Sequence, residues 1–195
     1  MNAITGLVLA GGLGRRMGGI DKGLVEFDGR PMVAHVIERL LPQVDALLIN
    51  ANQNAGNYAA FGHPVVPDRI AGFAGPLAGL HAGLVASTTP LLISVPCDSP
   101  FLPLDLVNRL RSALEAEHAQ LAVAKTGDQA HPVFSLVRRD VHDDLAAFLQ
   151  GGGRKIDAWY ARLAVVEVSF DDEAAAFANI NTREELTGYQ GAASK

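Results

Sequence analysis

The sequence is poor in cysteine and lacks any long apolar run. Its lone cysteine, Cys97, excludes an internal disulfide and fits a reducing compartment. The six histidines show neither the spacing of a zinc protease nor a Cys/His ligand pattern, which argues against a tetrahedral zinc site. No apolar run approaches the roughly 20 residues that span a bilayer. The first apolar stretch, residues 4–10, is short and follows no basic segment, so we expect no signal peptide, no membrane segment and a cytoplasmic location.

An excess of basic charge is also missing. The formal net charge is -5 and the two signs are interspersed, so no extended basic face is available for a polynucleotide backbone, and we expect no nucleic-acid partner. Hydrophobic residues make up 49% of the chain and charged residues 19%, which is typical of a globular protein. The 195 residues suffice for one sizeable core. We predict a single domain over residues 1–190, followed by a flexible tail at 191–195.

Short apolar runs bounded by turn residues recur along the chain and predict buried strands. These runs are residues 4–10, 46–50, 64–66, 91–95, 121–125, 133–137 and 165–168. Segments with helical spacing of apolar residues lie between or after them, at residues 31–41, 77–85, 104–114, 141–149 and 182–189. The alternation predicts an α/β fold, with a mainly parallel, Rossmann-like sheet between two layers of helices and right-handed crossovers.

A glycine-rich loop, GGLGRRMGGIDK at residues 11–22, follows the first predicted strand. In an open α/β sheet, ligands bind at the carboxyl ends of the strands, where this loop is expected. Its glycines allow the backbone to approach a polyphosphate and to turn N–H groups toward it, while Arg16 and Lys22 supply opposite charge. The loop therefore predicts a polyphosphate-binding site.

Two familiar phosphate-binding loops do not fit this segment. A P-loop requires Gly-Lys-Ser/Thr, but Lys22 is preceded by Asp21 and followed by Gly23. A dinucleotide-binding fingerprint requires a third glycine where Met17 stands, and an acid after the second strand where the chain has Asn50. A P-loop enzyme and a dehydrogenase are therefore poor interpretations.

Polar residues lie at the ends of the next three predicted strands. Asn50 and Asn52 end the second strand, Asp68 follows the third and Asp98 follows the fourth. Each could be a turn former or a helix cap. If the strands are parallel, however, all four converge on the edge that carries the glycine loop. An acid directly after a buried strand would be desolvated beside a polyphosphate unless a cation neutralised it, so we interpret Asp98 as a magnesium ligand.

These motifs resemble those of nucleotidyltransferases with the nucleotide-diphospho-sugar transferase fold, in the order LAGG (residues 9–12), RMG (16–18) and Lys22. The PCDSP segment at residues 96–100 is similar to PCDTP of the molybdenum cofactor guanylyltransferases. Cytidylyl-transferring relatives usually have LAAG in place of LAGG. The resemblance covers nearly the whole chain and implies a guanylyltransferase.

The resemblance implies a role for each matching residue. The implied GTP-binding residues are Leu9, Ala10, Gly11, Gly12, Lys22, Asn50, Asp68 and Asp98. The implied catalytic residues are Arg16, Lys22 and Asp98, of which Asp98 also holds Mg²⁺. One carboxylate can accept both donors of a guanine edge, and cytosine lacks that donor pair. We therefore hypothesise that Asp68 helps to select guanine.

Two further segments are implied to bind the acceptor. The GPLAG run at residues 75–79 is similar to the second glycine loop of the family, which assigns Gly75 and Gly79 to this site. The FANINT segment at residues 177–182 resembles FxNxNTP, whose asparagines lie near the pterin, which assigns Asn179 and Asn181. The chain has Arg183 where the family usually has proline. Alternatively, either asparagine caps the following helix.

The resulting hypothesis is transfer of GMP from GTP to the phosphate of molybdopterin, with or without molybdenum, with release of pyrophosphate and with Mg²⁺ as cofactor. The acceptor phosphate is ionised near neutral pH, so no strong general base is required. We expect the protein to be a monomer. Its expected partners are GTP, molybdopterin and other proteins of molybdenum cofactor biosynthesis. The alternatives are a cytidylyltransferase, a sugar-phosphate nucleotidyltransferase, and a nucleotide-binding regulator without catalysis.

Overall fold

The computed structural model describes residues 2–11, 21–70 and 75–177 of the chain. Its centre is a seven-stranded sheet of order β5-β4-β1-β6-β8-β7-β9. The strands are β1 (Ile4–Leu9), β4 (Ala46–Asn50), β5 (Val65–Val66), β6 (Leu91–Pro96), β7 (Leu121–Thr126), β8 (Gln129–Arg138) and β9 (Val165–Ser169). All seven predicted strands are therefore present.

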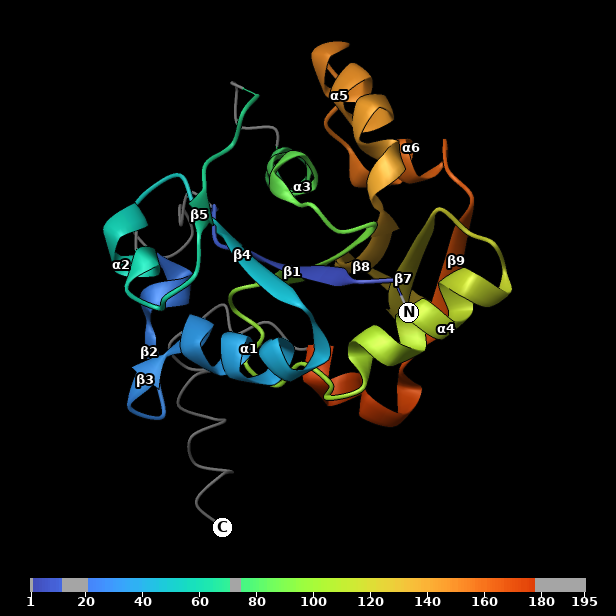
Figure 1. Cartoon of the computed structure of the whole chain (residues 1–195). Coiled ribbons are helices and arrows are strands. Elements are labelled where there is room, and N and C mark those ends of the chain that lie inside the picture. Colours follow the sequence, from blue (N-terminus) through green and yellow to red (C-terminus); the bar gives the residue numbers. More distant parts are fainter. Residues whose placement is uncertain (1, 12–20, 71–74, 178–195) are drawn as a thin grey trace.

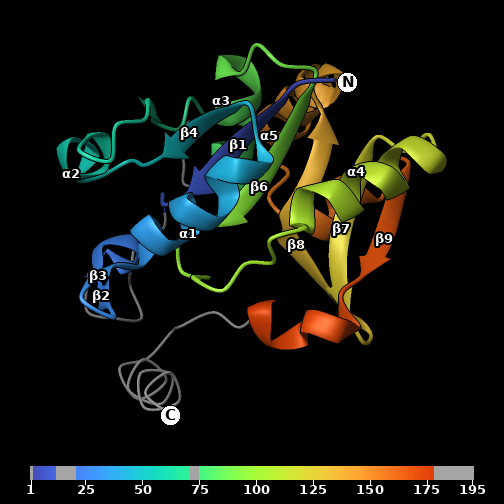
Figure 2. The same ribbon diagram turned by 60° about the horizontal axis from the view of Figure 1, so that its bottom comes forward.

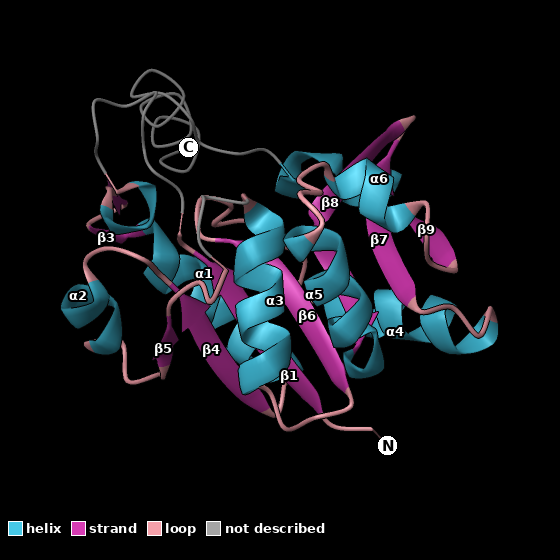
Figure 3. Cartoon of the chain, turned by 90° about the horizontal axis from the view of Figure 1, so that it is seen from above, coloured by secondary structure: helices cyan, strands magenta, loops and turns pink. Residues whose placement is uncertain are grey.

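Helices cover both faces of this sheet (Figure 1). One face carries α1 (Met32–Leu40) and α4 (Leu106–Ala116). The other face carries α3 (Pro76–Ala86), α5 (His142–Gln150) and α6 (Ile156–Tyr160), with α3 and α5 side by side (Figure 3). The predicted three-layer α/β fold is confirmed. The predicted helix at residues 182–189 lies outside the described residues.

The sheet is mostly parallel, as predicted, with one reversed strand. β1 pairs in parallel with β4 and with β6, β4 pairs in parallel with β5, and β7 pairs in parallel with β9. β8 runs antiparallel to β6 and β7. It starts at Gln129, four residues before the apolar run of residues 133–137, because the chain turns at Gly127-Asp128 and pairs at once with the end of β7. The carboxyl ends of β5, β4, β1 and β6 consequently lie at one edge.

The described residues form two large hydrophobic cores, one on each face of the sheet. They lie on opposite sides of β1 because successive strand residues point to opposite faces. Val8 packs into the core under α1, and Leu7 packs into the core under α3. A Cβ at Gly83 of α3 would lie 2.5 Å from Leu7 Cδ2. Glycine at this position therefore lets α3 pack close to the central strand. Burial of apolar side chains in these cores stabilises the fold by about 25 cal/mol per Å² of apolar surface.

Several short elements were not predicted from the sequence. An antiparallel hairpin of β2 (Glu26–Phe27) and β3 (Arg30–Pro31) precedes α1 (Figure 2), and α2 (Ala55–Ala59) follows β4. A 3-10 turn, η2 (Lys22–Leu24), begins where the glycine loop ends. α6 buries Trp159 completely, and the indole Nε1 donates to Asp144 Oδ1 at 3.0 Å. In the described part of the chain, every helix is too short or too polar to cross a bilayer.

Replacing Leu92 by alanine tests the importance of the core on β6. Leu92 is fully buried, so Leu92→Ala is expected to lower the free energy of unfolding by about 2–5 kcal/mol. Leu104 is 64% exposed, so Leu104→Ala is the matched control and is expected to change it by less than about 0.5 kcal/mol. Urea denaturation measures both values. Equal effects of the two substitutions would contradict the described core.

Candidate active site

The parallel strands bring three chain segments together at the carboxyl edge of the sheet. Leu9, the last residue of β1, lies in register with Asn50 on one side and with Pro96 on the other. Beyond the strands, the Ala10 N–H donates to the Asn50 carbonyl at 2.8 Å, and the Cys97 N–H donates to the Leu9 carbonyl at 3.1 Å. The start of the glycine loop and the residue before Asp98 are therefore neighbours.

Lys22 and Asp98, which belong to separate sequence motifs, form an ion pair at this edge. Lys22 Nζ lies 3.3 Å from Asp98 Oδ2, although the residues are 76 positions apart. The side chains are only 23% and 12% exposed. The fold thus places a cation and a carboxylate together in a largely desolvated position. Arg16, the third residue assigned to catalysis, lies outside the described residues, as does Gly12.

A second polar cluster joins Asn50, Asn52 and Asp68. The Asn50 amide donates to Asp68 Oδ1 at 2.9 Å, and the Asn52 amide donates to Asp68 Oδ2 at 2.9 Å. In return, the Asp68 backbone N–H donates to Asn52 Oδ1 at 2.8 Å. The Asn50 amide also donates to the Val66 carbonyl at 3.1 Å. These bonds fix the carboxylate of Asp68, yet each of its oxygens keeps a lone pair for another donor.

Asn52 is a residue of this cluster that was not among the predicted binding residues. Its side chain holds Asp68 through both its amide nitrogen and its oxygen. The sequence signal was the Asn-x-Asn spacing of Asn50 and Asn52 at a strand end, but only the fold brings the Asp68 carboxylate opposite both amides.

Two of the predicted glycines are needed for the close packing around Asn50. A Cβ at Gly11 would lie 2.9 Å from Asn50 Oδ1, and a Cβ at Gly79 would lie 2.3 Å from the same oxygen. Both values are shorter than ordinary van der Waals contact. The short distance at Gly79 places this residue of α3 directly against the Asn50–Asp68 cluster. Gly75, at the N-terminus of α3, has φ +67° and ψ -154°, a conformation that residues with a side chain disfavour. Asn179 and Asn181 lie outside the described residues.

The Cys97 thiol adjoins this edge but is not a nucleophile there. Burial and the nearby charges of Asp98 and Asp21 raise the pKa of the Cys97 thiol. The thiolate, which is the reactive form of cysteine, is therefore suppressed near neutral pH. Covalent catalysis through Cys97 does not fit this site.

The oxygen donors at this edge fit a magnesium ion that binds together with a nucleotide. Asp98 offers a hard carboxylate ligand of the type Mg²⁺ prefers, and Mg²⁺ usually takes one or two carboxylates plus phosphate oxygens and water. Within residues 2–11, 21–70 and 75–177, no group of three or more His, Cys, Asp or Glu side chains could hold a metal alone. A metal at Asp98 would share its coordination with phosphate oxygens of a nucleotide and with water.

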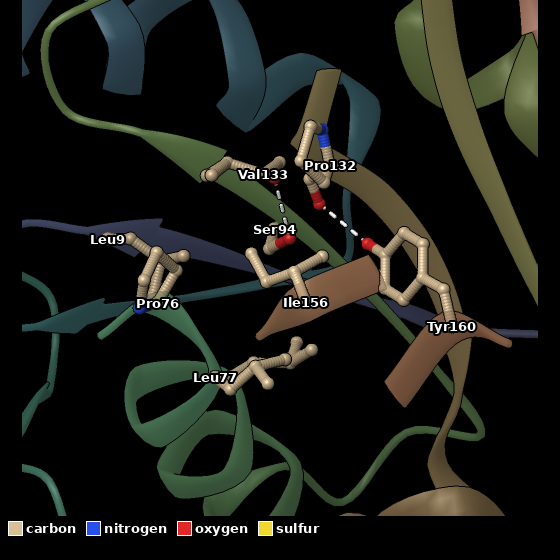
Figure 4. A pocket seen from close by; sticks show the side chains of 9 residues that line it. Leu9, Pro76, Leu77, Ser94, Pro132, Val133, Ile156 and Tyr160 are labelled. Atoms are coloured by element: carbon tan, nitrogen blue, oxygen red, sulfur yellow. Dashed lines mark hydrogen bonds between the residues drawn. The ribbon is translucent and has the colours of Figure 1, made fainter. Parts of the chain in front are cut away.

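A small cavity lies beside the N-terminus of α3, and its lining includes Leu9, Pro76 and Leu77 (Figure 4). Its volume is about 10 Å³, enough for about one water molecule. Its polar groups are engaged, because Ser94 Oγ donates to the Val133 carbonyl at 2.7 Å and the Tyr160 hydroxyl donates to the Pro132 carbonyl at 2.6 Å. The cavity is too small for a nucleotide or a pterin.

Residues 6–165 match the MobA-like NTP transferase domain family. The chain belongs to this family. The MobA-like chain is 54% identical over 192 residues to the molybdenum cofactor guanylyltransferase of Cupriavidus taiwanensis, with 96% of each chain covered. It is 55% identical over 192 residues to that of Cupriavidus necator, again with 96% of each chain covered.

Comparison with a solved structure supports the same family assignment. The fold is similar to that of molybdopterin-guanine dinucleotide biosynthesis protein A from Archaeoglobus fulgidus, with a TM-score of 0.82 and 26% sequence identity. The match covers 97% of this chain and 98% of that chain. The predicted family and fold type are confirmed, and the MobA-like chain is a nucleotidyltransferase.

Replacing Gly79 by alanine tests the packing around Asn50. Gly79→Ala is expected to displace the Asn50 side chain, which holds Asp68. If Asn50 and Asp68 bind the nucleotide, as their motifs predict, this change weakens GTP binding by about tenfold or more. Isothermal titration calorimetry with GTP and Mg²⁺ measures the change.

Gly83→Ala is the matched control for this substitution. Gly83 also belongs to α3, and a Cβ there would lie 2.5 Å from Leu7 Cδ2 of β1, in the core. Gly83→Ala is therefore expected to lower stability and to leave the affinity of the folded protein for GTP unchanged. Equal loss of affinity in both variants would contradict a specific role of Gly79.

Proposed function

We propose that this MobA-like protein transfers the GMP unit of GTP to the phosphate of molybdopterin and releases pyrophosphate. The names of its relatives in Cupriavidus support this activity. The observation that carries the proposal for the site is the pairing of Lys22 with Asp98 at 3.3 Å, beside the end of the glycine loop. A phosphoryl transfer needs a cation for phosphate oxygens and a carboxylate for a metal, and this pair offers both.

The proposed reaction is a displacement at the α-phosphorus of GTP. An oxygen of the molybdopterin phosphate forms the new bond to this phosphorus, while the bond to the oxygen bridging to the β-phosphate breaks. Pyrophosphate leaves with the electron pair. Because the attacking phosphate is already ionised, the protein needs to align the two reactants and neutralise charge rather than remove a proton.

Each residue has a proposed task in this reaction. Asp98 would hold Mg²⁺, which supplies charge neutralisation for the phosphates when bound. Lys22 would donate hydrogen bonds to the α-phosphoryl oxygens and the leaving pyrophosphate. Arg16 is proposed to share the task of Lys22, and Leu9, Ala10, Gly11 and Gly12 to surround the nucleotide. The residues proposed to contact the acceptor are Gly75, Gly79, Asn179 and Asn181. These assignments rest on the matching motifs.

We propose that the enzyme is a single domain. Residues 1–190 would form one domain, because the segments from both halves of the described chain share one sheet. We further propose a cytoplasmic monomer that exchanges molybdopterin with other proteins of cofactor biosynthesis. The sole cysteine, Cys97, is a buried free thiol, which is compatible with a reducing compartment.

Removal of Lys22 or Asp98 tests the proposed chemistry. Lys22→Ala and Asp98→Ala are each expected to lower kcat by about a hundredfold to a thousandfold, because a contact to developing charge is lost. Pyrophosphate release from GTP with molybdopterin and Mg²⁺ measures kcat, and circular dichroism checks the fold.

Arg111→Ala is a control that removes a cation from α4, where Arg111 pairs with Glu115 at 2.9 Å. Its kcat is expected to equal that of the wild type, because exposed pairs within a helix contribute little. Near wild-type activity of Lys22→Ala or Asp98→Ala would refute their proposed roles.

The carboxylate of Asp68 is proposed to select guanine. Its two oxygens are held by Asn50 and Asn52, and they retain capacity to accept the N1–H and N2–H donors of a guanine edge. Asp68→Ala is expected to weaken GTP binding by about tenfold or more and to leave CTP binding unchanged, because cytosine lacks this donor pair. Titration calorimetry with each nucleotide and Mg²⁺ measures both affinities.

Asp128→Ala is the control, since Asp128 is exposed in the turn between β7 and β8. If Asp68→Ala weakened the binding of GTP and of CTP equally, Asp68 would support the structure of the site without selecting guanine. Wild-type protein that binds CTP more tightly than GTP would instead favour a cytidylyltransferase.

A further inference from the structure

Helix α2 and the residue before it anchor the end of the glycine loop through Asp21. The Tyr58 hydroxyl donates a hydrogen bond to Asp21 Oδ1. The Asn54 amide donates to Asp21 Oδ2 at 3.0 Å. Both carboxylate oxygens of Asp21 are therefore held from the same short segment, residues 54–58. Asp21 is the residue directly before Lys22.

Tyr58 also supports the residue on the other side of Lys22. A Cβ at Gly23 would lie 2.5 Å from the Tyr58 hydroxyl oxygen and 3.2 Å from Cys97 Sγ. The backbone at Gly23 therefore rests directly on the Tyr58 hydroxyl and on the residue that precedes Asp98. Through this packing, the two residues that flank Lys22 both contact the same phenol oxygen.

The properties of Tyr58 and Asn54 suit them to hold a loop rather than to touch a substrate. Tyr58 is fully buried, and burial raises the pKa of its phenol, so the hydroxyl stays protonated as a donor. Asn54 has φ +53°, in the left-handed region that asparagine tolerates better than most residues. The backbone thus adopts an uncommon conformation at the residue whose amide reaches Asp21.

We propose that Tyr58 and Asn54, acting through Asp21, are positioning residues that hold Lys22 in place for the phosphates of the nucleotide. This inference rests on the role proposed above for Lys22. The lysine side chain has a long flexible stem, so the place of its ammonium group depends on a fixed backbone at Lys22. A displacement of about 1 Å in an aligned catalytic group can lower the rate by about a hundredfold.

The substitution Tyr58→Phe tests the inference because it keeps the buried ring and removes only the hydroxyl. It is expected to lower kcat by about tenfold to a hundredfold, through misplacement of Lys22. Tyr160→Phe is the matched control. It removes a hydroxyl that donates to the Pro132 carbonyl at 2.6 Å and not to Asp21, and is expected to keep kcat within about twofold of the wild type.

A double-mutant cycle distinguishes positioning of Lys22 from a general structural effect. In protein that carries Lys22→Ala, the further change Tyr58→Phe is expected to leave kcat unchanged, because the group that it positions is absent. If the two losses multiply instead, Tyr58 does not act through Lys22 and the inference is wrong. Wild-type kcat in Tyr58→Phe alone would also overturn it.

Asn54→Gly provides the second test, in case Tyr58→Phe fails to fold. Glycine keeps the left-handed backbone at this exposed residue and removes the amide that holds Asp21. A severalfold loss of kcat that disappears in the Lys22→Ala background supports the inference, and an unchanged kcat contradicts it. Wild-type protein that releases no pyrophosphate from GTP would refute the proposed function itself, a result distinct from either.

Discussion

The ion pair of Lys22 with Asp98 depends on the whole topology of the sheet. The two side chains come from loops after different strands, and they meet because β1 and β6 are adjacent and parallel. Burying two charges costs desolvation energy, so a largely buried pair contributes little to stability by itself. This desolvation cost is explained if the pair binds a ligand, since a metal–nucleotide complex offers phosphate oxygens to Lys22 and a cation to Asp98. The two charged residues are therefore explained by ligand binding rather than by stability.

Neighbouring residues hold the other polar groups of this edge in place. Gly11 and Gly79 leave room for Asn50, which together with Asn52 fixes the carboxylate of Asp68. Helix α2 and Asn54 hold the end of the glycine loop through Asp21. The small residues and the amides therefore act together: the glycines permit close approach, and the amides fix the charged groups. This arrangement positions polar groups before a nucleotide binds, which lowers the cost of binding.

The sequence predicted the strands, the layers and most of the polar edge, because apolar runs and strand-end residues are local signals. The direction of β8 has no local signal, and its first residues, 129–132, precede the apolar run of residues 133–137. Helix α2 was missed because AGNYA has one large apolar residue. Asp21 served only to exclude a P-loop, since its partner Tyr58 is 37 positions away and becomes a neighbour only in the fold.

The proposed roles of Lys22 and Asp98 can be checked in a crystal structure with a non-hydrolysable GTP analogue and Mg²⁺. We expect a magnesium ion at about 2.0–2.1 Å from a carboxylate oxygen of Asp98. We also expect Lys22 Nζ to have left Asp98 and to lie within hydrogen-bond distance of a phosphate oxygen of the analogue. A triphosphate bound elsewhere, or a metal held without Asp98 while Lys22 keeps its ion pair, would show that these roles are wrong.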